Sequence, residues 1–131
     1  MKIIHEIGTR KTAVARATLK PGTGVVRLNG QVLDSLPENM FRTKIMEPIL
    51  LAGDIPTKVD ITVEVQGGGS NSQAEAARLA VAKTLAAFDK SLQNVYSDYD
   101  RNLVVADVRR KESAKPNRQG KARAKRQKSY R

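Results

Sequence analysis

Residues 57–88 read "TKVDITVEVQGGGSNSQAEAARLAVAKTLAAF" and contain the clearest strand and the clearest helix of the chain. Apolar and polar side chains alternate over 57–66, which predicts a strand with one buried face. Apolar residues then recur at spacings of four, four and three over 73–88, which predicts a helix with one apolar stripe. Ser72 and Glu75 have the spacing of a capping box and are expected to mark the start of this helix.

The residues on the N-terminal side of this unit predict further strands. Residues 13–29 are expected to form a hairpin, because "AVARATL" and "VVRLN" are joined by the turn-forming stretch "KPGTG". Alternation in the first arm places Ala13 and its neighbours on one face and Arg16 on the other. "KIIHEI" near the start and "LVVAD" at 103–107 are two more short strand candidates.

Two further helices are expected on either side of the central unit. The first covers 38–46, and Pro48 should end or kink it, which leaves "ILLAG" as a turn. The second is shorter and covers 92–99. Strands and helices mixed along the chain predict a two-layer α+β sandwich, formed by residues 1–108 as a folded body.

Charge is divided unevenly along the 131 residues, which carry a net charge of +11. Residues 109–131 read "RRKESAKPNRQGKARAKRQKSYR" and hold 11 basic side chains and one acidic one. Residues 1–108 hold 13 basic and 12 acidic side chains. A nearly neutral body joined to a polycation indicates a polyanionic partner, which is a nucleic acid, an anionic membrane or an acidic protein.

The basic segment 109–131 is therefore expected to be an extended tail. A nonspecific charge run that solubilises or localises the chain is the plain alternative. Two features favour a specific partner: small spacers such as Ala and Gly separate the cations, and there is almost no acid for internal pairing. Such a segment should be disordered alone and become ordered on its polyanion, with a log–log salt slope of about −0.7 per phosphate on single strands.

Other residue types exclude several classes of site. The chain has no cysteine, which rules out a disulfide framework and a thiolate metal site. No run approaches the ~20 apolar residues of a membrane span, and "MKIIHEIG" is too short and polar for a signal peptide, so we expect a soluble intracellular protein without a cofactor. His5 is the only histidine and lacks the usual partners for metal or triad chemistry.

The carboxylates Asp98, Asp100 and Asp107 lie close in sequence but show no pattern of a general acid–base pair. They are expected to cap helices or to pair with Arg101, Arg109 and Arg110.

Three cations of the body are candidates for phosphate contact. Arg10 and Lys11 stand just before the first long strand, and Arg16 is expected on its outer face. A solvated edge that discourages strand association is the alternative. The polycationic tail in the same chain favours phosphate contact.

Gly67, Gly68 and Gly69 precede the predicted helix and allow more than one interpretation. Free N–H groups at a helix start attract phosphate, which suggests contact with an RNA backbone or with a nucleotide. The spacing is not that of a Walker loop. The alternative is a strand-to-helix turn that needs positive φ or a close backbone approach.

Five stretches in order resemble one family, and they cover nearly the whole chain. They are "GTRKTAVARATLKPGTGVVRLNG", "IMEPILLAG", "VDITVEVQGGGSNSQAEAARLAVAKTL", "YDRNLVVADVRR" and "KARAKRQKSYR". Together they resemble the ninth protein of the small ribosomal subunit. The forms "KIMEP", "YDR" and "QKSYR" resemble its archaeal and eukaryotic branch, and the short start favours an archaeal-type member.

The resemblance implies a specific fold and location. The fold would be a β-α-β sandwich with a left-handed crossover, like the second domain of ribosomal protein S5, followed by the extended basic tail. The protein would be a structural, non-enzymatic component of the cytoplasmic small subunit, lying in its head on ribosomal RNA beside neighbouring proteins. The end of the tail would reach the anticodon stem-loop of the peptidyl-site tRNA. Neither a membrane nor a small-molecule substrate is implied.

The resemblance, together with the charge pattern, assigns the candidate site residues to two partners. The tRNA would be contacted by Lys128, Tyr130 and Arg131. The ribosomal RNA would be contacted by Arg10, Lys11, Arg16, Arg109, Arg110, Lys111, Lys115, Arg118, Lys121, Arg123, Lys125 and Arg126.

Two other functions remain as alternatives. A general nucleic-acid-binding basic protein would also need the tail. A phosphate-binding enzyme akin to small-molecule kinases would need metal-binding carboxylates and a positioned cation, and the sequence does not assign them.

Overall fold

The computed structural model describes residues 3–35 and 40–109. The predicted helix start at residue 38 and the predicted tail from residue 110 onward lie outside the described residues. Within them, strands and helices form a mixed α+β arrangement, as the sequence predicts.

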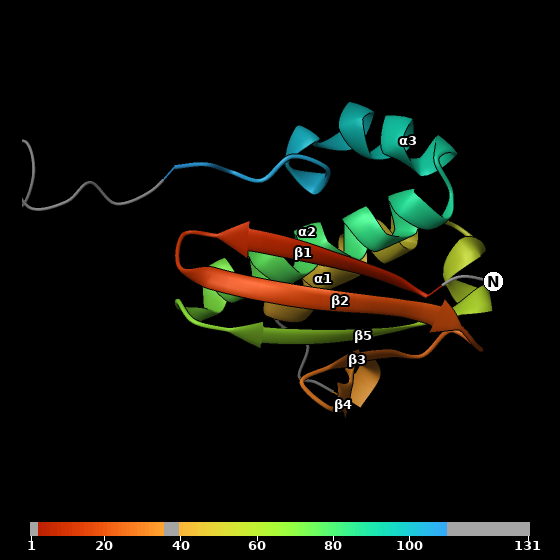
Figure 1. Cartoon of the computed structure of the whole chain (residues 1–131), viewed down its shortest axis with the longest axis horizontal. Coiled ribbons are helices and arrows are strands. Elements are labelled where there is room, and N and C mark those ends of the chain that lie inside the picture. Colours follow the sequence, from red (N-terminus) through yellow and green to blue (C-terminus); the bar gives the residue numbers. More distant parts are fainter. Residues whose placement is uncertain (1–2, 36–39, 110–131) are drawn as a thin grey trace, which may run out of the picture.

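Five strands form a single sheet in the order β1-β2-β5-β3-β4 (Figure 1). The β3–β5 pair is parallel and the other three pairs are antiparallel. The strands are β1 (Ile4–Arg10), β2 (Ala13–Pro21), β3 (Val26–Leu28), β4 (Gln31–Val32) and β5 (Val59–Gln66).

The predicted hairpin over 13–29 is wrong, although both of its strands exist. β5 lies between β2 and β3, and each of them pairs with β5 rather than with the other. The stretch "KPGTG" does reverse the chain, but it carries the chain past the end of β5. The Asp60 carboxylate of β5 holds this connection, because its Oδ1 accepts N–H bonds from Thr23, Gly24 and Val25 at 3.0, 3.1 and 3.0 Å.

The hairpin that does form joins β1 to β2. Arg10 pairs with Ala13 at its closed end, so Lys11 and Thr12 form the turn. Lys11 adopts a positive φ of 53°, a conformation more common for glycine and asparagine. The sequence gives little warning of this turn, because neither residue is a typical turn former.

The main helices α1 (Met40–Leu51) and α2 (Ser70–Phe88) cover one face of the sheet, as Figure 1 shows. α3 (Ser91–Tyr99) confirms the predicted short helix and packs against α2 and α1. Three 3₁₀ turns complete the described elements: η1 (Leu33–Ser35), η2 (Ile55–Lys58) and η3 (Arg101–Leu103).

Three further details differ from the prediction, two in helices and one in a predicted strand. α1 continues through Pro48 to Leu51, so the helix does not end at this proline, and the predicted turn at "ILLAG" does not begin there. The fixed φ of proline is compatible with a helix. The Pro48 carbonyl accepts a buried 2.7 Å hydrogen bond from the Tyr96 hydroxyl.

α2 begins at Ser70 with Gly69 as its N-cap, so the predicted capping box of Ser72 and Glu75 is wrong. Glu75 pairs with Arg10 instead. "LVVAD" forms no named strand but begins in η3 and makes one isolated bridge, between Asp107 and Arg10.

Small side chains fill the space between the sheet and α2. The predicted inward residues of β2 and β5 are buried, from Ala13 to Leu19 and from Val59 to Val65. Ala76, Ala77 and Ala80 face them from α2 and are fully buried. Because these residues are small, the helix lies close to the strands and the core needs few aromatic rings.

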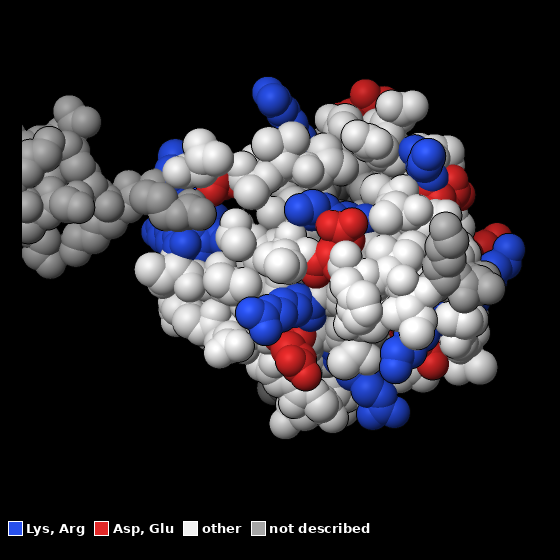
Figure 2. Space-filling model, viewed as in Figure 1, with Lys and Arg blue, Asp and Glu red and all other residues white. Residues whose placement is uncertain are grey.

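The opposite face of the sheet faces outward. Arg16 lies there with Ile7 on β1 and Glu64 on β5 as its cross-strand neighbours, as the alternation predicts. The side of the molecule seen in Figure 2 mixes Lys and Arg with Asp and Glu among many uncharged residues. This mixture agrees with the nearly neutral body expected from residues 1–108.

Candidate nucleic-acid interface

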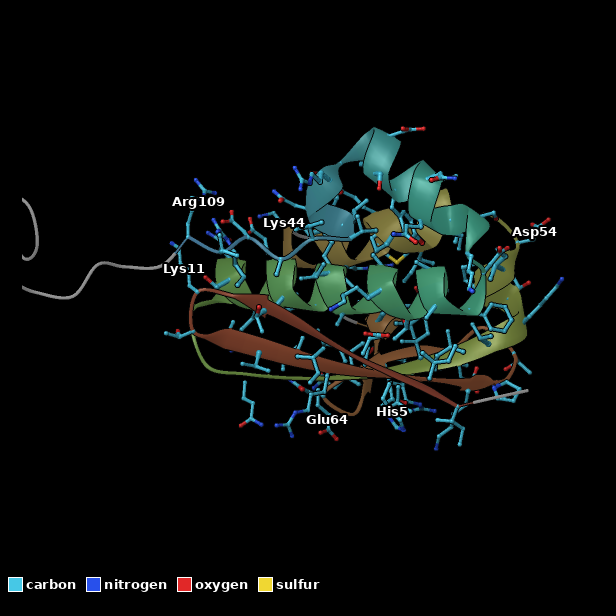
Figure 3. The ribbon with its side chains drawn as sticks, turned by 45° about the horizontal axis from the view of Figure 1, so that its top comes forward. His5, Lys11, Lys44, Asp54, Glu64 and Arg109 are labelled. Atoms are coloured by element: carbon cyan, nitrogen blue, oxygen red, sulfur yellow. The ribbon has the colours of Figure 1, made fainter. Side chains whose placement is uncertain are left out.

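Three segments that are distant in sequence meet at one end of the body. They are the β1–β2 turn (10–12), the loop between β5 and α2 (67–69), and the last described residues (107–109). A Cβ on Gly67 would lie 2.6 Å from the Thr12 carbonyl oxygen, and Arg10 bridges Asp107. Figure 3 shows Lys11 and Arg109 at this end, which we call the tail-exit end.

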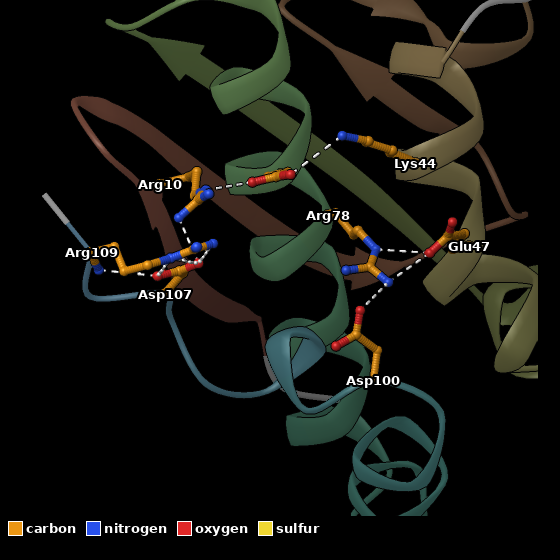
Figure 4. Close-up of polar contacts among 8 residues, drawn as sticks. Arg10, Lys44, Glu47, Arg78, Asp100, Asp107 and Arg109 are labelled. Carbon is orange, nitrogen blue, oxygen red and sulfur yellow. Dashed lines mark hydrogen bonds and ion pairs between the residues drawn. The ribbon is translucent and has the colours of Figure 1, made fainter. Parts of the chain in front are cut away.

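A chain of five charged residues holds the tail-exit end together (Figure 4). Arg10 Nε lies 2.5 Å from Glu75 Oε2, and Lys44 Nζ lies 3.3 Å from Glu75 Oε1. On the other side, Arg10 Nη1 lies 2.6 Å from Asp107 Oδ2, which is also 2.7 Å from Arg109 Nη2. The network therefore links α1, α2, β1 and the start of the predicted tail.

Asp107 is the carboxylate that this network encloses. Its side chain is 13% exposed, whereas that of Arg109 is 77% exposed. The side-chain and backbone hydrogen bonds from Arg109 hold the pKa of Asp107 well below its usual range, and the charge of Arg10 adds to the effect. The predicted pairing of Asp107 with Arg109 is confirmed.

Two other carboxylates of the body are also stabilised in their ionised form. Burial by itself would raise the pKa of Glu75, but hydrogen bonds from Arg10 and Lys44 outweigh it and lower the pKa overall. The backbone N–H groups of Val25 and Thr23 lower the pKa of Asp60. Folding is therefore coupled to ionisation at three carboxylates.

A second network lies beside the first and joins the helices. Arg78 of α2 pairs with Glu47 of α1 at 2.6 Å and with Asp100 at 3.1 Å. Asp100 also accepts the N–H of Asn102 at 3.0 Å and so caps η3. Asp100 thus caps as predicted, but its arginine partner among the described ion pairs is Arg78 rather than a neighbour in sequence.

The glycine loop is explained in part by its backbone. Gly67 and Gly68 have φ values of 82° and 66°, and a Cβ on either would press on Thr12 or Ala13. These two glycines fit the interpretation of a strand-to-helix turn. Gly69 has no described heavy atom within 4 Å of its Cβ position, and no described side chain caps the start of α2 there. Phosphate contact by this loop stays a prediction.

The three candidate cations of the body occupy different settings. Lys11 is exposed at the turn, Arg16 is exposed on the outer sheet face, and Arg10 is 15% exposed and paired with two carboxylates. The other candidates, from Arg110 to Arg131, lie outside the described residues. Sequence analysis missed Lys44 and assigned Glu75 only to a capping box, because no local pattern shows that these residues meet at Arg10.

Other kinds of site find little support in the described chain. His5 is an exposed strand residue whose Nδ1 lies 3.1 Å from the Thr18 hydroxyl. Among residues 3–35 and 40–109, no cluster of His, Asp and Glu could hold a metal ion. None of the helices described is both long and apolar enough to cross a membrane.

A sequence model of the family described as ribosomal protein S9/S16 matches residues 8–131. The chain belongs to this family. Its relatives include the small ribosomal subunit protein uS9 of Methanococcus vannielii, 44% identical over 134 residues, and that of Thermoplasma volcanium, 47% identical over 133 residues. A third, from Methanococcus maripaludis, is 43% identical over 134 residues, and each of the three matches spans the whole of both chains.

Membership in the S9/S16 family confirms the resemblance found in the sequence, and all three relatives come from archaea, as predicted. The family is one of ribosomal structural proteins, so the S9/S16 chain is a ribosomal protein and not an enzyme. The ionic networks that the structure describes are accordingly interpreted as structural, not as catalytic.

Acid is expected to destabilise the folded body. The pKa values of Asp60, Glu75 and Asp107 are lower in the folded chain than the ~4 of unfolded carboxylates. Their stabilising contribution is therefore complete above about pH 5 and is lost as the pH falls through the folded pKa values. Urea unfolding midpoints measured at decreasing pH would show this loss. The Asp107→Asn variant should lose less stability between neutral and acid pH, and equal losses in both proteins would contradict the assignment to Asp107.

Proposed function

We propose that this chain is a structural component of the small-subunit head, where its body binds ribosomal RNA and its tail extends to the peptidyl-site tRNA. The observation that carries the proposal is the family match over residues 8–131, which includes the whole polycation. Eleven of the 24 basic side chains lie in residues 109–131, so the strongest attraction to RNA belongs to the tail. Neighbouring proteins of the head would complete the environment in the cytoplasmic ribosome.

The tail-exit end supports RNA contact by the body itself. Lys11 is exposed at a turn, and α2 begins nearby with Gly69 as its N-cap, where no described side chain caps the helix. The N-terminus of a helix attracts phosphate through its free N–H groups and its dipole. Both features lie beside Arg109, where residues 110–131 continue the chain. One stretch of RNA backbone could therefore contact the body and the tail in succession.

The remaining candidate cations would act from other positions. Arg16 would contact RNA from the outer sheet face. Arg10 contributes chiefly through its ion pairs, because a direct phosphate contact would require it to exchange a carboxylate partner.

The tail supplies the longest-range contacts of the proposal. The residues proposed to bind ribosomal RNA there are Arg109, Arg110, Lys111, Lys115, Arg118, Lys121, Arg123, Lys125 and Arg126. Lys128, Tyr130 and Arg131 at its end would contact the tRNA anticodon stem-loop, with Arg131 on a backbone phosphate.

The proposal also includes the finer fold. β3 and β5 are parallel neighbours, and the chain passes through α1 between them. This connection is the crossover that the family resemblance implies to be left-handed, as in the second domain of ribosomal protein S5. The parallel pairing and the helix between the two strands support it.

Deleting residues 128–131 is expected to leave assembly intact and to weaken tRNA retention. A charge-assisted contact contributes roughly 1–3 kcal/mol, so the tRNA should dissociate about tenfold faster from such ribosomes. The measurement compares tRNA off-rates of ribosomes that carry full-length or shortened chains, after both chains are shown to remain in small subunits through a high-salt wash.

The two readouts separate the parts of the proposal. Equal tRNA off-rates would defeat the tRNA contact alone. Release of the full-length chain from small subunits in high salt would defeat the structural role, and equal binding to any nucleic acid would favour a general nucleic-acid-binding protein.

A further inference from the structure

The carboxylate of Asp107 holds the junction between the body and the predicted tail, although the tail itself is cationic. Asp107 accepts three hydrogen bonds from the Arg109 side chain and one from its backbone N–H, at 2.7 to 3.0 Å. The Arg10 guanidinium of β1 lies on its other side at 2.6 Å. A backbone bridge joins the same two residues, Arg10 and Asp107, in parallel.

The body holds Arg10 rigidly for this contact. Glu75 of α2 binds Arg10 Nε at 2.5 Å, and Lys44 of α1 binds the other oxygen of Glu75 at 3.3 Å. Arg10 is only 15% exposed, so its guanidinium has little freedom to move. Asp107 therefore meets a fixed partner, and the residue that follows it in the chain begins from a fixed point and direction.

We infer that Asp107 is a positioning residue, which uses Arg10 to set where residues 110–131 leave the body and so favours their binding to structured ribosomal RNA. This inference rests on the proposed function. A tethered segment binds better when its start is held near its target, because less orientational freedom is lost on binding. The advantage exists only when the body is docked on the same folded RNA.

Because Asp107 is negatively charged, the inference can be tested by whether its substitution raises or lowers the affinity for RNA. Removing an anion beside a polycation should, by charge alone, tighten binding to every RNA. Loss of positioning should instead weaken binding to structured RNA and leave binding to unstructured RNA unchanged or tighter. The two explanations thus predict opposite changes for one substitution.

The first experiment compares full-length Asp107→Asn with full-length Asp98→Asn. Asp98 is exposed on α3, so its substitution makes the same change of charge away from the junction. Dissociation constants are measured for a transcript of the small-subunit ribosomal RNA and for polyuridine at one salt concentration. We expect Asp107→Asn to bind the transcript roughly tenfold more weakly, with polyuridine binding unchanged or tighter. Equal or tighter binding of the transcript by Asp107→Asn would overturn the inference.

A second experiment replaces the ion pair of Arg10 and Asp107 by a disulfide, which joins the two segments without these charges. The chain has no cysteine, and bridged backbones lie about 4.8 Å apart, within the range of a disulfide. The double variant Arg10→Cys, Asp107→Cys keeps the net charge, and thermal unfolding checks that its body is folded. The oxidised form should bind the transcript like the wild type, and the reduced form should bind it like Asp107→Asn.

The outcomes distinguish the inference from the proposed function. Identical affinities of the oxidised and reduced forms for the transcript would overturn the positioning role. If the wild-type chain itself binds the transcript no better than polyuridine, the proposed function fails as well.

Discussion

A chain that ends at residue 108 is expected to lose more than about a thousandfold in affinity for ribosomal RNA at low salt. Its body would keep 13 basic and 12 acidic side chains, so almost no net attraction to phosphate would remain. If about ten tail cations meet phosphates, the log–log salt slope should become flatter by about 7. Equilibrium binding to the small-subunit RNA across a salt titration measures both quantities. The yield of assembled small subunits should also be low when the truncated chain replaces the full-length chain.

A full-length control separates the charge of the tail from its length. In this variant the basic side chains of residues 109–131 are replaced by glutamine, so the chain can still extend but carries little charge there. It should behave like the truncated chain if counterion release dominates. A truncated chain with the salt slope of the wild type, or with a normal yield of small subunits, would contradict the division into neutral body and cationic tail.

Gly8→Ala is expected to destabilise the body by about 3 kcal/mol or more, because no space exists for a methyl group between β1 and α2. A Cβ on Gly8 would lie 2.2 Å from the Ala76 carbonyl oxygen and 2.6 Å from the Ala80 backbone nitrogen. Both atoms belong to the α2 backbone, so the strand and the helix must separate. A loss of this size is a large part of the stability of a small domain and should lower the unfolding temperature by more than about 10 °C.

Gly69→Ala is the matched control for this prediction. Gly69 has a φ of −96° and no described heavy atom within 4 Å of its Cβ position. Replacing glycine by alanine at an N-cap should cost about 1 kcal/mol or less. Calorimetric unfolding of the two variants measures the contrast. An unfolding temperature of Gly8→Ala equal to that of the wild type would show that α2 does not lie against β1 as described.

Much of the secondary structure followed from local patterns. β5 and the inward face of β2 were predicted from alternation, and most of α2 was predicted from its apolar stripe, because burial imposes these periods along one element. The predicted hairpin failed because a turn signal shows where a chain reverses and not which strand becomes its neighbour. The capping box failed because Glu75 binds Arg10, a residue 65 positions away, rather than the start of its own helix.

For the candidate site, too, local patterns could be predicted from the sequence and long-range contacts could not. Sequence analysis selected Lys11, Arg109 and the glycine loop as separate candidates, but it could not show that they share the tail-exit end. It predicted the pairing of Asp107 with Arg109, two positions away, and missed its contact with Arg10.

Sequence alone determined the division of charge, the inward faces of the main elements and the family, because each depends on the order of residues and not on their distances in space. Only the tertiary structure decided that β5 lies between β2 and β3 and that Asp107 meets Arg10. The physical reason is that strand order and ion pairing depend on which distant segments pack together, and that packing reflects the whole core rather than any one stretch of chain.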